Sequence, residues 1–250
     1  MTVTREVLAR LRAGSTASIA TLLHRRGLRN QYVQGVRPIG DAKPMAGPAF
    51  TLRYIPARED LDVVEAFRDP AHPQRLAVET VPAGHVLVMD CRRDATAASA
   101  GSILLTRLEM RGCAGVVTDA GVRDAAGIAA LALPCYAAGA SAPTNLSRHH
   151  AVDTNVPIGC GGAPVFPGDV IVGDGDGVIV VPQEIAAEIA DALGPMEAFE
   201  AFAIEEMRAG RPVVGTYPAN EATLSRYEAY KRGEYRPEPV PARPPLVEEA

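Results

Sequence analysis

The chain has 250 residues, of which 47% are hydrophobic, and a formal net charge of −5. This length is enough for one large domain or two small ones with a substantial core. The acidic balance argues against nucleic acid as a direct partner, and no apolar run reaches the roughly 20 residues of a membrane span. The amphipathic start of the chain has no signal-peptide core, so we expect a cytoplasmic location and reduced, buried cysteines.

The N-terminal pattern predicts two helices, over residues 4–12 and 15–26. Ser15 or Thr16 is a plausible N-cap for the second helix, because a side-chain hydroxyl can accept from a free N–H of the first turn. Gly27 follows the last apolar position as a C-cap. We therefore expect a helical hairpin at the start of the protein.

The middle of the chain alternates between strand and helix patterns, which indicates an α/β class with a mixed central sheet. The turn signals at 167–169 and 174–177 predict that the last three strands form a meander. Neither GxGxxG nor a P-loop occurs, so a nucleotide cofactor has no support. The expected strands are 49–54, 85–90, 115–119, 134–137, 164–166, 170–173 and 177–181, and the expected helices are 61–67, 101–110 and 128–133.

A C-terminal helical arm is expected over residues 183–211, with a break or kink at Gly194-Pro195. The arm carries more apolar residues than an exposed appendage should, which predicts packing on another copy in a homo-oligomer, as a trimer or hexamer. Four prolines within the nine residues from Arg236 predict a disordered or draped tail.

Arg123 and Asp124 are the leading candidates for a functional pair, because they follow the buried-type run of residues 115–117. Open α/β folds bind ligands just beyond their strand ends. A permanent cation beside one carboxylate suits a metal-bound, negatively charged small substrate, since Mg²⁺ can be held by a single protein carboxylate and several waters. The alternative is a surface Arg-Asp pair. Three further acids also lie near strand ends and are weighed beside Asp124 as metal ligands, namely Asp90, Asp94 and Asp119.

The small-residue turn before the helix at 101–110 is a second candidate site. A helix N-terminus exposes free N–H groups and a partial positive charge, so it can hold a substrate carboxylate. The alternative is an ordinary helix capped by Ser102. His149 and His150 have no third ligand at a metal-site spacing, and we expect both in a surface turn.

Six segments, in this order, resemble the RraA-like family: residues 15–20, 47–51, 101–104, 111–124, 167–169 and 176–182. That family includes the regulator of ribonuclease E activity and the divalent-metal-dependent 4-hydroxy-4-methyl-2-oxoglutarate aldolases, which also decarboxylate oxaloacetate. The resemblance implies an α/β/α swivelling-domain sandwich, assembled as a trimer or hexamer with active sites between subunits. It implies a domain over residues 1–215, including the arm from about 183, and a C-terminal extension over 216–250.

The same resemblance implies roles for individual residues. Asp124 would be the ligand of Mg²⁺ or Mn²⁺, and Arg123 would bind the pyruvyl part of a 2-keto acid. The segment Gly101, Ser102, Ile103 and Leu104 would bind the substrate, with the N–H groups of Ile103 and Leu104 on its carboxylate. Glu200 of the adjacent subunit would reach the metal. The family's aldolases carry an acid where Ser102 stands.

These expectations favour a metal-dependent lyase that cleaves a 4-hydroxy-2-keto acid, decarboxylates oxaloacetate, or does both through a pyruvate enolate. Two alternatives stay open. One is a dehydratase or related enolate enzyme acting on a 2-keto-3-deoxy sugar acid. The other is a non-catalytic ring that binds and regulates a ribonuclease.

Overall fold

The computed structural model describes residues 3–239 and divides the chain into two compact units. The first unit ends at Leu193 and the second begins at Gly194, within the long helix α6 (Ala186–Arg208). The division lies earlier than the domain boundary near residue 215 that the sequence predicts. Most of the predicted tail from Arg236 falls on residues 240–250, outside the described residues.

The N-terminal helical hairpin is confirmed as α1 (Arg5–Ala13) and α2 (Thr16–Arg25). Ser15 caps α2, because its Oγ accepts from the N–H of Ala17 at 3.1 Å. The Asp174 carboxylate binds the same helix end, accepting from the Thr16 N–H at 2.8 Å and the Thr16 hydroxyl at 2.7 Å. These bonds join the hairpin to the sheet, where both helices pack against the strands described next.

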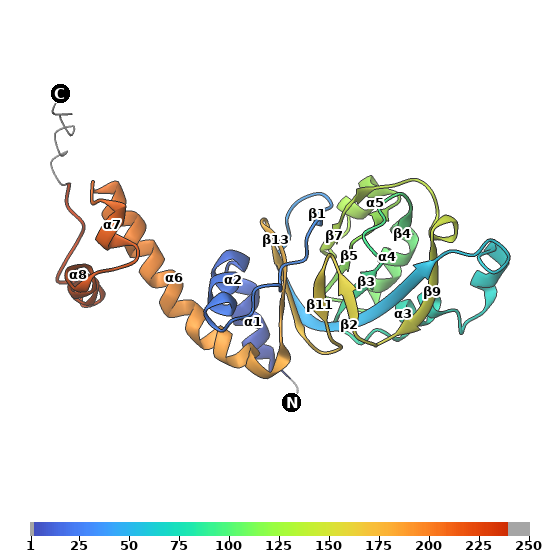
Figure 1. Cartoon of the computed structure of the whole chain (residues 1–250), viewed down its shortest axis with the longest axis horizontal. Coiled ribbons are helices and arrows are strands. Elements are labelled where there is room, and N and C mark those ends of the chain that lie inside the picture. The colour runs from blue at the N-terminus through green and yellow to red at the C-terminus, as the bar shows by residue number, and fades with distance from the viewer. Residues whose placement is uncertain (1–2, 240–250) are drawn as a thin grey trace, which may run out of the picture. The chain divides into compact units, whose positions relative to one another are not determined.

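The central sheet has eight strands in the order β1-β7-β5-β3-β2-β12-β13, with β9 pairing to β2 (Figure 1). Neighbours among β2, β3, β5 and β7 are parallel, and the other pairings are antiparallel, so the predicted mixed α/β sheet is confirmed. The strands are β1 (Arg37–Pro38), β2 (Met45–Pro56), β3 (Val86–Asp90), β5 (Gly115–Thr118), β7 (Cys135–Ala137), β9 (His149–Thr154), β12 (Val170–Asp174) and β13 (Gly177–Val181).

Both faces of the central strands are buried, which explains their continuous apolar runs. Side chains alternate between the faces with a period of two. On β3, Leu87 and Met89 join the core beneath the helices α3 (Pro73–Thr80) and α4 (Ser102–Met110). Val86 and Val88 join a second core, covered by the hairpin of β10 (Ile158–Cys160) and β11 (Ala163–Val165).

A small parallel sheet of three strands lies beside the main one and positions the site. It consists of β4 (Ala98–Ala100), β6 (Gly121–Val122) and β8 (Gly139–Ala140). The short helix α5 (Ala125–Ala129) follows β6. The remaining short elements are the 3₁₀ helices η1 (Val64–Arg68), η2 (Asn145–Ser147) and η3 (Gln183–Ile185).

Several sequence predictions are wrong in detail. The strand β11 pairs with β10 and not with β12, because positive φ angles at Gly161 and Gly162 turn the chain back on itself directly after β10. The predicted three-stranded meander is therefore only the β12–β13 hairpin. The helix expected at 61–67 is only η1. The helix expected at 128–133 lies at 125–129, because the Asp124 carbonyl already accepts from the Ile128 N–H.

The location predicted for His149 and His150 is also wrong. They begin β9, where His149 is fully buried against Tyr54 and burial lowers the pKa of its imidazole. His150 lies 2.9 Å from the carboxylate of Asp62. A surface turn is therefore wrong for both, because alternation along a strand sends one ring into the core and leaves the other half-buried.

The second unit contains the C-terminal part of α6 together with α7 (Val213–Thr216) and α8 (Glu221–Lys231). The sequence predicts a break or a kink at Gly194-Pro195, and the break is wrong because α6 continues through Pro195. Phe202 is fully buried among tyrosines of this unit. Glu206 is also fully buried and holds the guanidinium of Arg226 at 2.8 Å. Within residues 3–239, no helix is long and apolar enough to cross a membrane.

Candidate functional site

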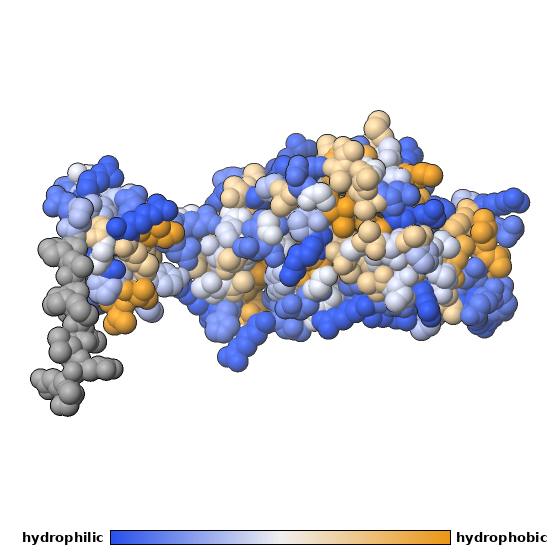
Figure 2. Space-filling view, turned by 90° about the horizontal axis from the view of Figure 1, so that it is seen from above, coloured by the Kyte–Doolittle hydropathy of each residue, from blue (hydrophilic) through white to orange (hydrophobic). Residues whose placement is uncertain are grey.

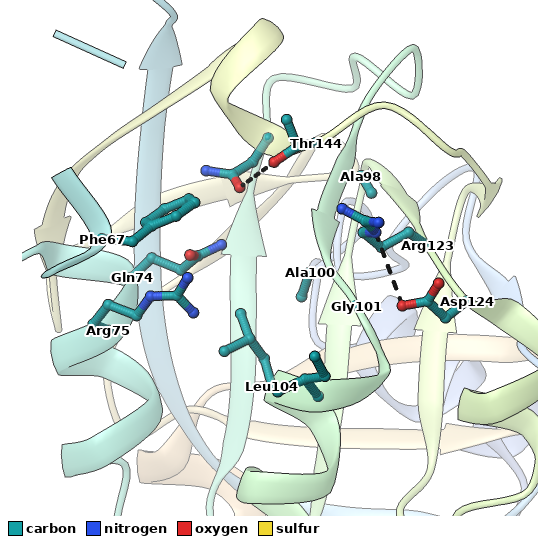
Figure 3. Close-up of a pocket in the computed structure, with 12 residues that line it drawn as sticks. Phe67, Gln74, Arg75, Ala98, Ala100, Gly101, Leu104, Arg123, Asp124 and Thr144 are labelled. Carbon is teal, nitrogen blue, oxygen red and sulfur yellow. Dashed lines mark hydrogen bonds and ion pairs between the residues drawn. The ribbon is translucent and has the colours of Figure 1, made fainter. Parts of the chain in front are cut away.

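A pocket of about 230 Å³ opens in the first unit, between the α3 region and the ends of the small parallel sheet (Figure 3). It gathers the predicted segment at the start of α4 and the Arg123-Asp124 pair, which are far apart in the sequence. The residues that line it are Phe67, Gln74, Arg75, Ala98, Ala100, Gly101, Ile103, Leu104, Arg123, Asp124, Thr144 and Asn145.

The pairing of β4 with β6 brings these segments together. The strands are parallel, with Ala100 opposite Val122, so the residues that follow each strand emerge side by side. The N–H of Arg123 donates to the Ala100 carbonyl at 3.0 Å. The site therefore lies just beyond parallel strand ends, as the sequence argument expects.

Arg123 and Asp124 form a loose pair that leaves both groups accessible. The Nε of Arg123 lies 3.8 Å from Oδ2 of Asp124, and each side chain is 49% exposed. Asp124 has a left-handed backbone with φ 59° and ψ 41°, a conformation that is uncommon for residues other than glycine. Strain of this kind collects at functional sites, where the surrounding structure holds a side chain in a required direction.

Gly101 allows the two segments to approach each other. A Cβ at this position would lie 2.6 Å from Cγ of Arg123 and 3.1 Å from Oδ2 of Asp124. Any side chain here would push the guanidinium and the carboxylate away. Glycine is thus required by the packing of the site, although its own φ of −130° is available to every residue.

The first turn of α4 offers free backbone N–H groups to the pocket. Gly101 is the N-cap, and its carbonyl accepts from the N–H of Leu104 at 3.1 Å. The Ile103 N–H has no acceptor among residues 3–239. Of the two amides named from the sequence, that of Ile103 is therefore open to a ligand in this chain, while that of Leu104 is engaged.

Ser102 is the first residue of α4 and not its cap, so the alternative of a helix capped by Ser102 is wrong. Its hydroxyl donates to Oδ2 of Asp124 at 3.2 Å. Gly127 of α5 lies close beneath it, because a Cβ there would be 3.3 Å from Cβ of Ser102. The serine therefore orients the carboxylate of Asp124.

The other acids near strand ends bind backbone groups instead of facing the pocket. Asp119 is buried and accepts from the N–H groups of Cys91 and Gly161 at 2.6 and 3.0 Å. Burial raises the pKa of Asp119. Asp90 accepts from the Arg92 N–H at 2.9 Å, and Asp94 from the Thr96 N–H at 3.0 Å. These three carboxylates stabilise loops. The four cysteines are free and buried, as predicted.

The residues of the pocket suit a hard divalent cation that keeps much of its water. Residues 3–239 contain no group of three or more His, Cys, Asp or Glu side chains able to hold a metal. A closed site of the zinc type therefore has no ligands in this part of the chain. Mg²⁺ and Mn²⁺ accept one carboxylate plus waters, and the half-exposed Asp124 beside the Ser102 hydroxyl offers such oxygen donors. Glu200 belongs to the second unit, where it accepts from the Tyr217 hydroxyl at 3.1 Å, and its role at the metal stays a prediction.

The sequence did not point to five of the lining residues, namely Phe67, Gln74, Arg75, Thr144 and Asn145. Gln74 and Arg75 lie on α3, which was not predicted as a helix. A usable signal was present, because Pro73 occupies the first turn of α3, where proline is favoured, and apolar residues follow at 76–78. Phe67 and Asn145 lie on 3₁₀ turns, which carry no comparable pattern.

Comparison with known proteins gives a consistent result. The model of the RraA-like family, described as Aldolase/RraA, matches residues 16–180. A protein of Halalkalibacterium halodurans named "Putative 4-hydroxy-4-methyl-2-oxoglutarate aldolase" is 34% identical over 157 residues, covering 63% of this chain and 68% of that protein. A protein of the same name from Burkholderia mallei is 33% identical over 144 residues, covering 58% of this chain and 79% of its own.

Solved structures show the same fold. The crystal structure of RraAS2 from Streptomyces coelicolor, titled an unusual member of the RNase ES inhibitor RraA family, has a TM-score of 0.72 and 30% identity. It covers 81% of this chain and 98% of that one. The RNA-processing inhibitor RraA from Thermus thermophilis has a TM-score of 0.53 and 25% identity, covering 68% and 93%.

The strained backbone at Asp124 generates a stability prediction. In the presence of EDTA, Asp124→Gly should raise the free energy of unfolding by about 0.5–1 kcal/mol, because glycine adopts a left-handed conformation without the Cβ penalty. Asp124→Ala should lower it by a similar amount. Urea denaturation measures both. Asn155→Gly, at φ 55° outside the pocket, is the matched control and should stabilise equally. A destabilised Asp124→Gly would show that the carboxylate and not the backbone governs folding here.

Proposed function

The chain belongs to the RraA-like family, and from this premise we propose that it is a divalent-metal-dependent lyase acting on a small 2-keto acid. The observation that supports this most is the convergence of Arg123, Asp124 and the free Ile103 N–H on one pocket. Asp124 provides a carboxylate for a metal ion, Arg123 a positive charge for an anionic substrate, and Ile103 a backbone donor. The reaction would give pyruvate and a second product, which is an aldehyde or ketone after retro-aldol cleavage and carbon dioxide after decarboxylation.

In this proposal the protein groups bind and orient a substrate around a developing negative charge. The Arg123 guanidinium and the Ile103 N–H receive the carboxylate and the 2-keto oxygen. Asp124 would hold Mg²⁺ or Mn²⁺, which when bound acts as a Lewis acid toward the keto oxygen. Breaking the C3–C4 bond, whose electrons pass into the carbon next to the C2 ketone, leaves a pyruvate enolate, and the preorganised charge of Arg123 would stabilise it.

The pocket favours decarboxylation over retro-aldol cleavage within a single chain. Decarboxylation of oxaloacetate releases carbon dioxide and needs no base, since the bonding electrons pass directly into the enolate. Retro-aldol cleavage must also remove the proton of the 4-hydroxyl. Ser102 has no acidic or basic group to take that proton, unlike the acid of the family's aldolases. Dehydration of a 2-keto-3-deoxy sugar acid would need a base as well.

A non-catalytic regulator is the second candidate, favoured by the similarity to RraAS2 of Streptomyces, a member of the RNase ES inhibitor family, and to the RNA-processing inhibitor of Thermus. In that function Asp124 would be dispensable. The same surface could belong to an enzyme or to a regulator. Measurements of metal binding and of turnover therefore distinguish the two functions.

We propose a homo-oligomer, as a trimer or hexamer, because each unit exposes large apolar side chains. In the first unit Val64 is 68% and Ile103 82% exposed, and Figure 2 shows hydrophobic surface over the segment at the right-hand end of the view. In the second unit Val214 is 89% exposed. Contiguous exposed apolar surface is typical of protein interfaces.

The oligomer proposal predicts a mass of three or six times 26.3 kDa by light scattering at micromolar concentration. The measurement should be repeated at high salt, where an apolar interface persists and one held by surface charges weakens. A single species at the monomer mass would refute the proposal.

The lyase proposal predicts that oxaloacetate decarboxylation requires a divalent cation. Asp124→Asn should abolish both turnover and the heat of Mg²⁺ or Mn²⁺ binding in calorimetry, since an amide is a much weaker ligand. Arg123→Ala should retain metal binding while kcat/KM falls about 100- to 1,000-fold, as for loss of one preorganised charge donor. Asp94→Asn, another acid near a strand end, is the control and should behave as wild type. Full turnover in EDTA, or in Asp124→Asn, would exclude this mechanism.

The Ser102 hydroxyl, 3.2 Å from Oδ2 of Asp124, generates a further prediction. Ser102→Asp would place a second carboxylate there, which should tighten Mg²⁺ binding and supply a base. Retro-aldol cleavage of a 4-hydroxy-2-keto acid should then rise by about 100-fold, the lower end for general base catalysis, whereas decarboxylation should change little. Ser102→Asn keeps the shape without the charge and should give no increase. Equal effects of the aspartate and asparagine variants on cleavage would contradict the assigned role.

A further inference from the structure

Two buried amide side chains line the pocket, and each keeps one polar atom without a hydrogen bond. Gln74 is 2% exposed, and its Nε2 donates to the Ser99 carbonyl at 2.7 Å, while its Oε1 has no partner within the described residues. Asn145 is 6% exposed, and its Nδ2 has no acceptor in this part of the chain. A buried polar atom without a hydrogen bond is costly, so two of them in one pocket point to a bound polar molecule.

The strand β4 anchors both amides at neighbouring positions. Gln74 binds the carbonyl of Ser99, which also fixes the direction of its side chain, because a carbonyl accepts from Nε2 and not from Oε1. The N–H of the preceding residue, Ala98, donates at 2.9 Å to the carbonyl of Pro143, two residues before Asn145. The two unpaired atoms have opposite needs, since Oε1 requires a donor and Nδ2 requires an acceptor. One water molecule can satisfy both.

The pocket lacks a side chain that could protonate an enolate. Among the residues that line it in the described chain, the one carboxyl group is that of Asp124, which in the proposed function holds the metal ion as a carboxylate. The Thr144 hydroxyl is directed at Oδ1 of Asn145, 3.4 Å away. Decarboxylation of oxaloacetate nevertheless consumes one proton, which must reach C3 before pyruvate is formed. That proton therefore comes from water.

We infer that Gln74 and Asn145 hold the water molecule that protonates C3 of the pyruvate enolate. The inference rests on the proposed function and adds to it the step that follows cleavage of the C–C bond. Both residues are positioning residues, because they bind the water and do not touch the reacting carbon.

The hydrogen bonds of this water leave one hydrogen for transfer. Asn145 Nδ2 donates to the water oxygen, and the water donates one hydrogen to Gln74 Oε1, so the second hydrogen is free to meet the substrate. On transfer its O–H bond breaks, the C2–C3 π electrons of the enolate form the new C3–H bond, and the C2 ketone is restored. The hydroxide left behind takes a proton from bulk solvent, which reaches the pocket past the half-exposed Arg123 and Asp124.

Arg75 supplies a positive charge on the side of the pocket where the hydroxide forms. Figure 3 shows Arg75 beside Gln74, facing Arg123 and Asp124 across the pocket. No acidic side chain within residues 3–239 forms an ion pair with Arg75. A preorganised cation whose charge is not neutralised stabilises an anion that develops next to it.

Proton exchange separates this step from cleavage of the C–C bond. In D₂O with Mg²⁺, the C3 hydrogens of pyruvate exchange through the same enolate, and proton NMR follows their loss, whereas carbon dioxide release from oxaloacetate reports cleavage alone. In Gln74→Met and in Asn145→Leu the exchange rate should fall about 100-fold, the lower end for a positioned proton donor. The kcat for carbon dioxide release should stay within about twofold, because the enolate can leave and take its proton from solvent.

The double variant tests whether the two amides hold one water. It should exchange no more slowly than either single variant, because both substitutions release the same molecule and residues that act as a unit are not additive. Gln183→Met is the matched control, since Gln183 lies in η3 and is not among the residues that line this pocket in the described chain. It should exchange at the wild-type rate. A merely structural role of the amides would instead lower exchange and carbon dioxide release together, and this result would overturn the inference.

A crystal structure of the wild type gives a second, independent measurement. It should show one ordered water within about 3.2 Å of both Gln74 Oε1 and Asn145 Nδ2, and its absence would refute the inference. A wild type that releases carbon dioxide without catalysing exchange would also refute it and leave the proposed function standing. A wild type that does neither would refute the lyase function, and the proton-transfer step with it.

Discussion

The site depends on the close approach of the Gly101 backbone to the Arg123 side chain. The parallel pairing of β4 and β6 sets this approach, because Ala100 lies opposite Val122 and the next residue of each strand leaves the sheet at the same edge. The absence of a Cβ at Gly101 lets the Arg123 stem pass within van der Waals distance of the α4 N-terminus. A free N–H, a guanidinium and a carboxylate therefore share one small volume, although 22 residues separate the serine and the aspartate that are hydrogen-bonded there.

Electrostatics of the pocket differ from those of the whole chain. The protein carries a net charge of −5, yet the pocket contains two arginines and one aspartate. One arginine is balanced loosely by Asp124, and the other has no acidic partner in the described residues. The pocket thus carries an excess of positive charge although the protein as a whole is acidic, and this local balance favours anionic ligands.

The sequence predicted the elements whose signals are local and missed those that depend on tertiary context. The α2 cap at Ser15, the start of α4 and the buried strands β3 and β5 follow from capping and apolar runs, and all are confirmed. The strand β4 was not predicted, because Ala-Ser-Ala has no strand-like side chains. Partners that are distant in the sequence hold it extended, namely β6, the Pro143 carbonyl and the Gln74 side chain. The burial of Glu206 also depends on tertiary context, because its partner Arg226 lies on another helix of the second unit.

Arg123 and Asp124 could be found from the sequence because they follow a recognisable strand, whereas Arg75 could not, because its helix was not predicted and its partner ring lies on a 3₁₀ turn. The strand-end signal therefore leads to Arg123, Asp124 and the start of α4, which lie on one side of the pocket. The residues opposite belong to α3 and to 3₁₀ helices, whose local patterns are weaker. The sequence thus points to only part of the lining, and the fold supplies the rest.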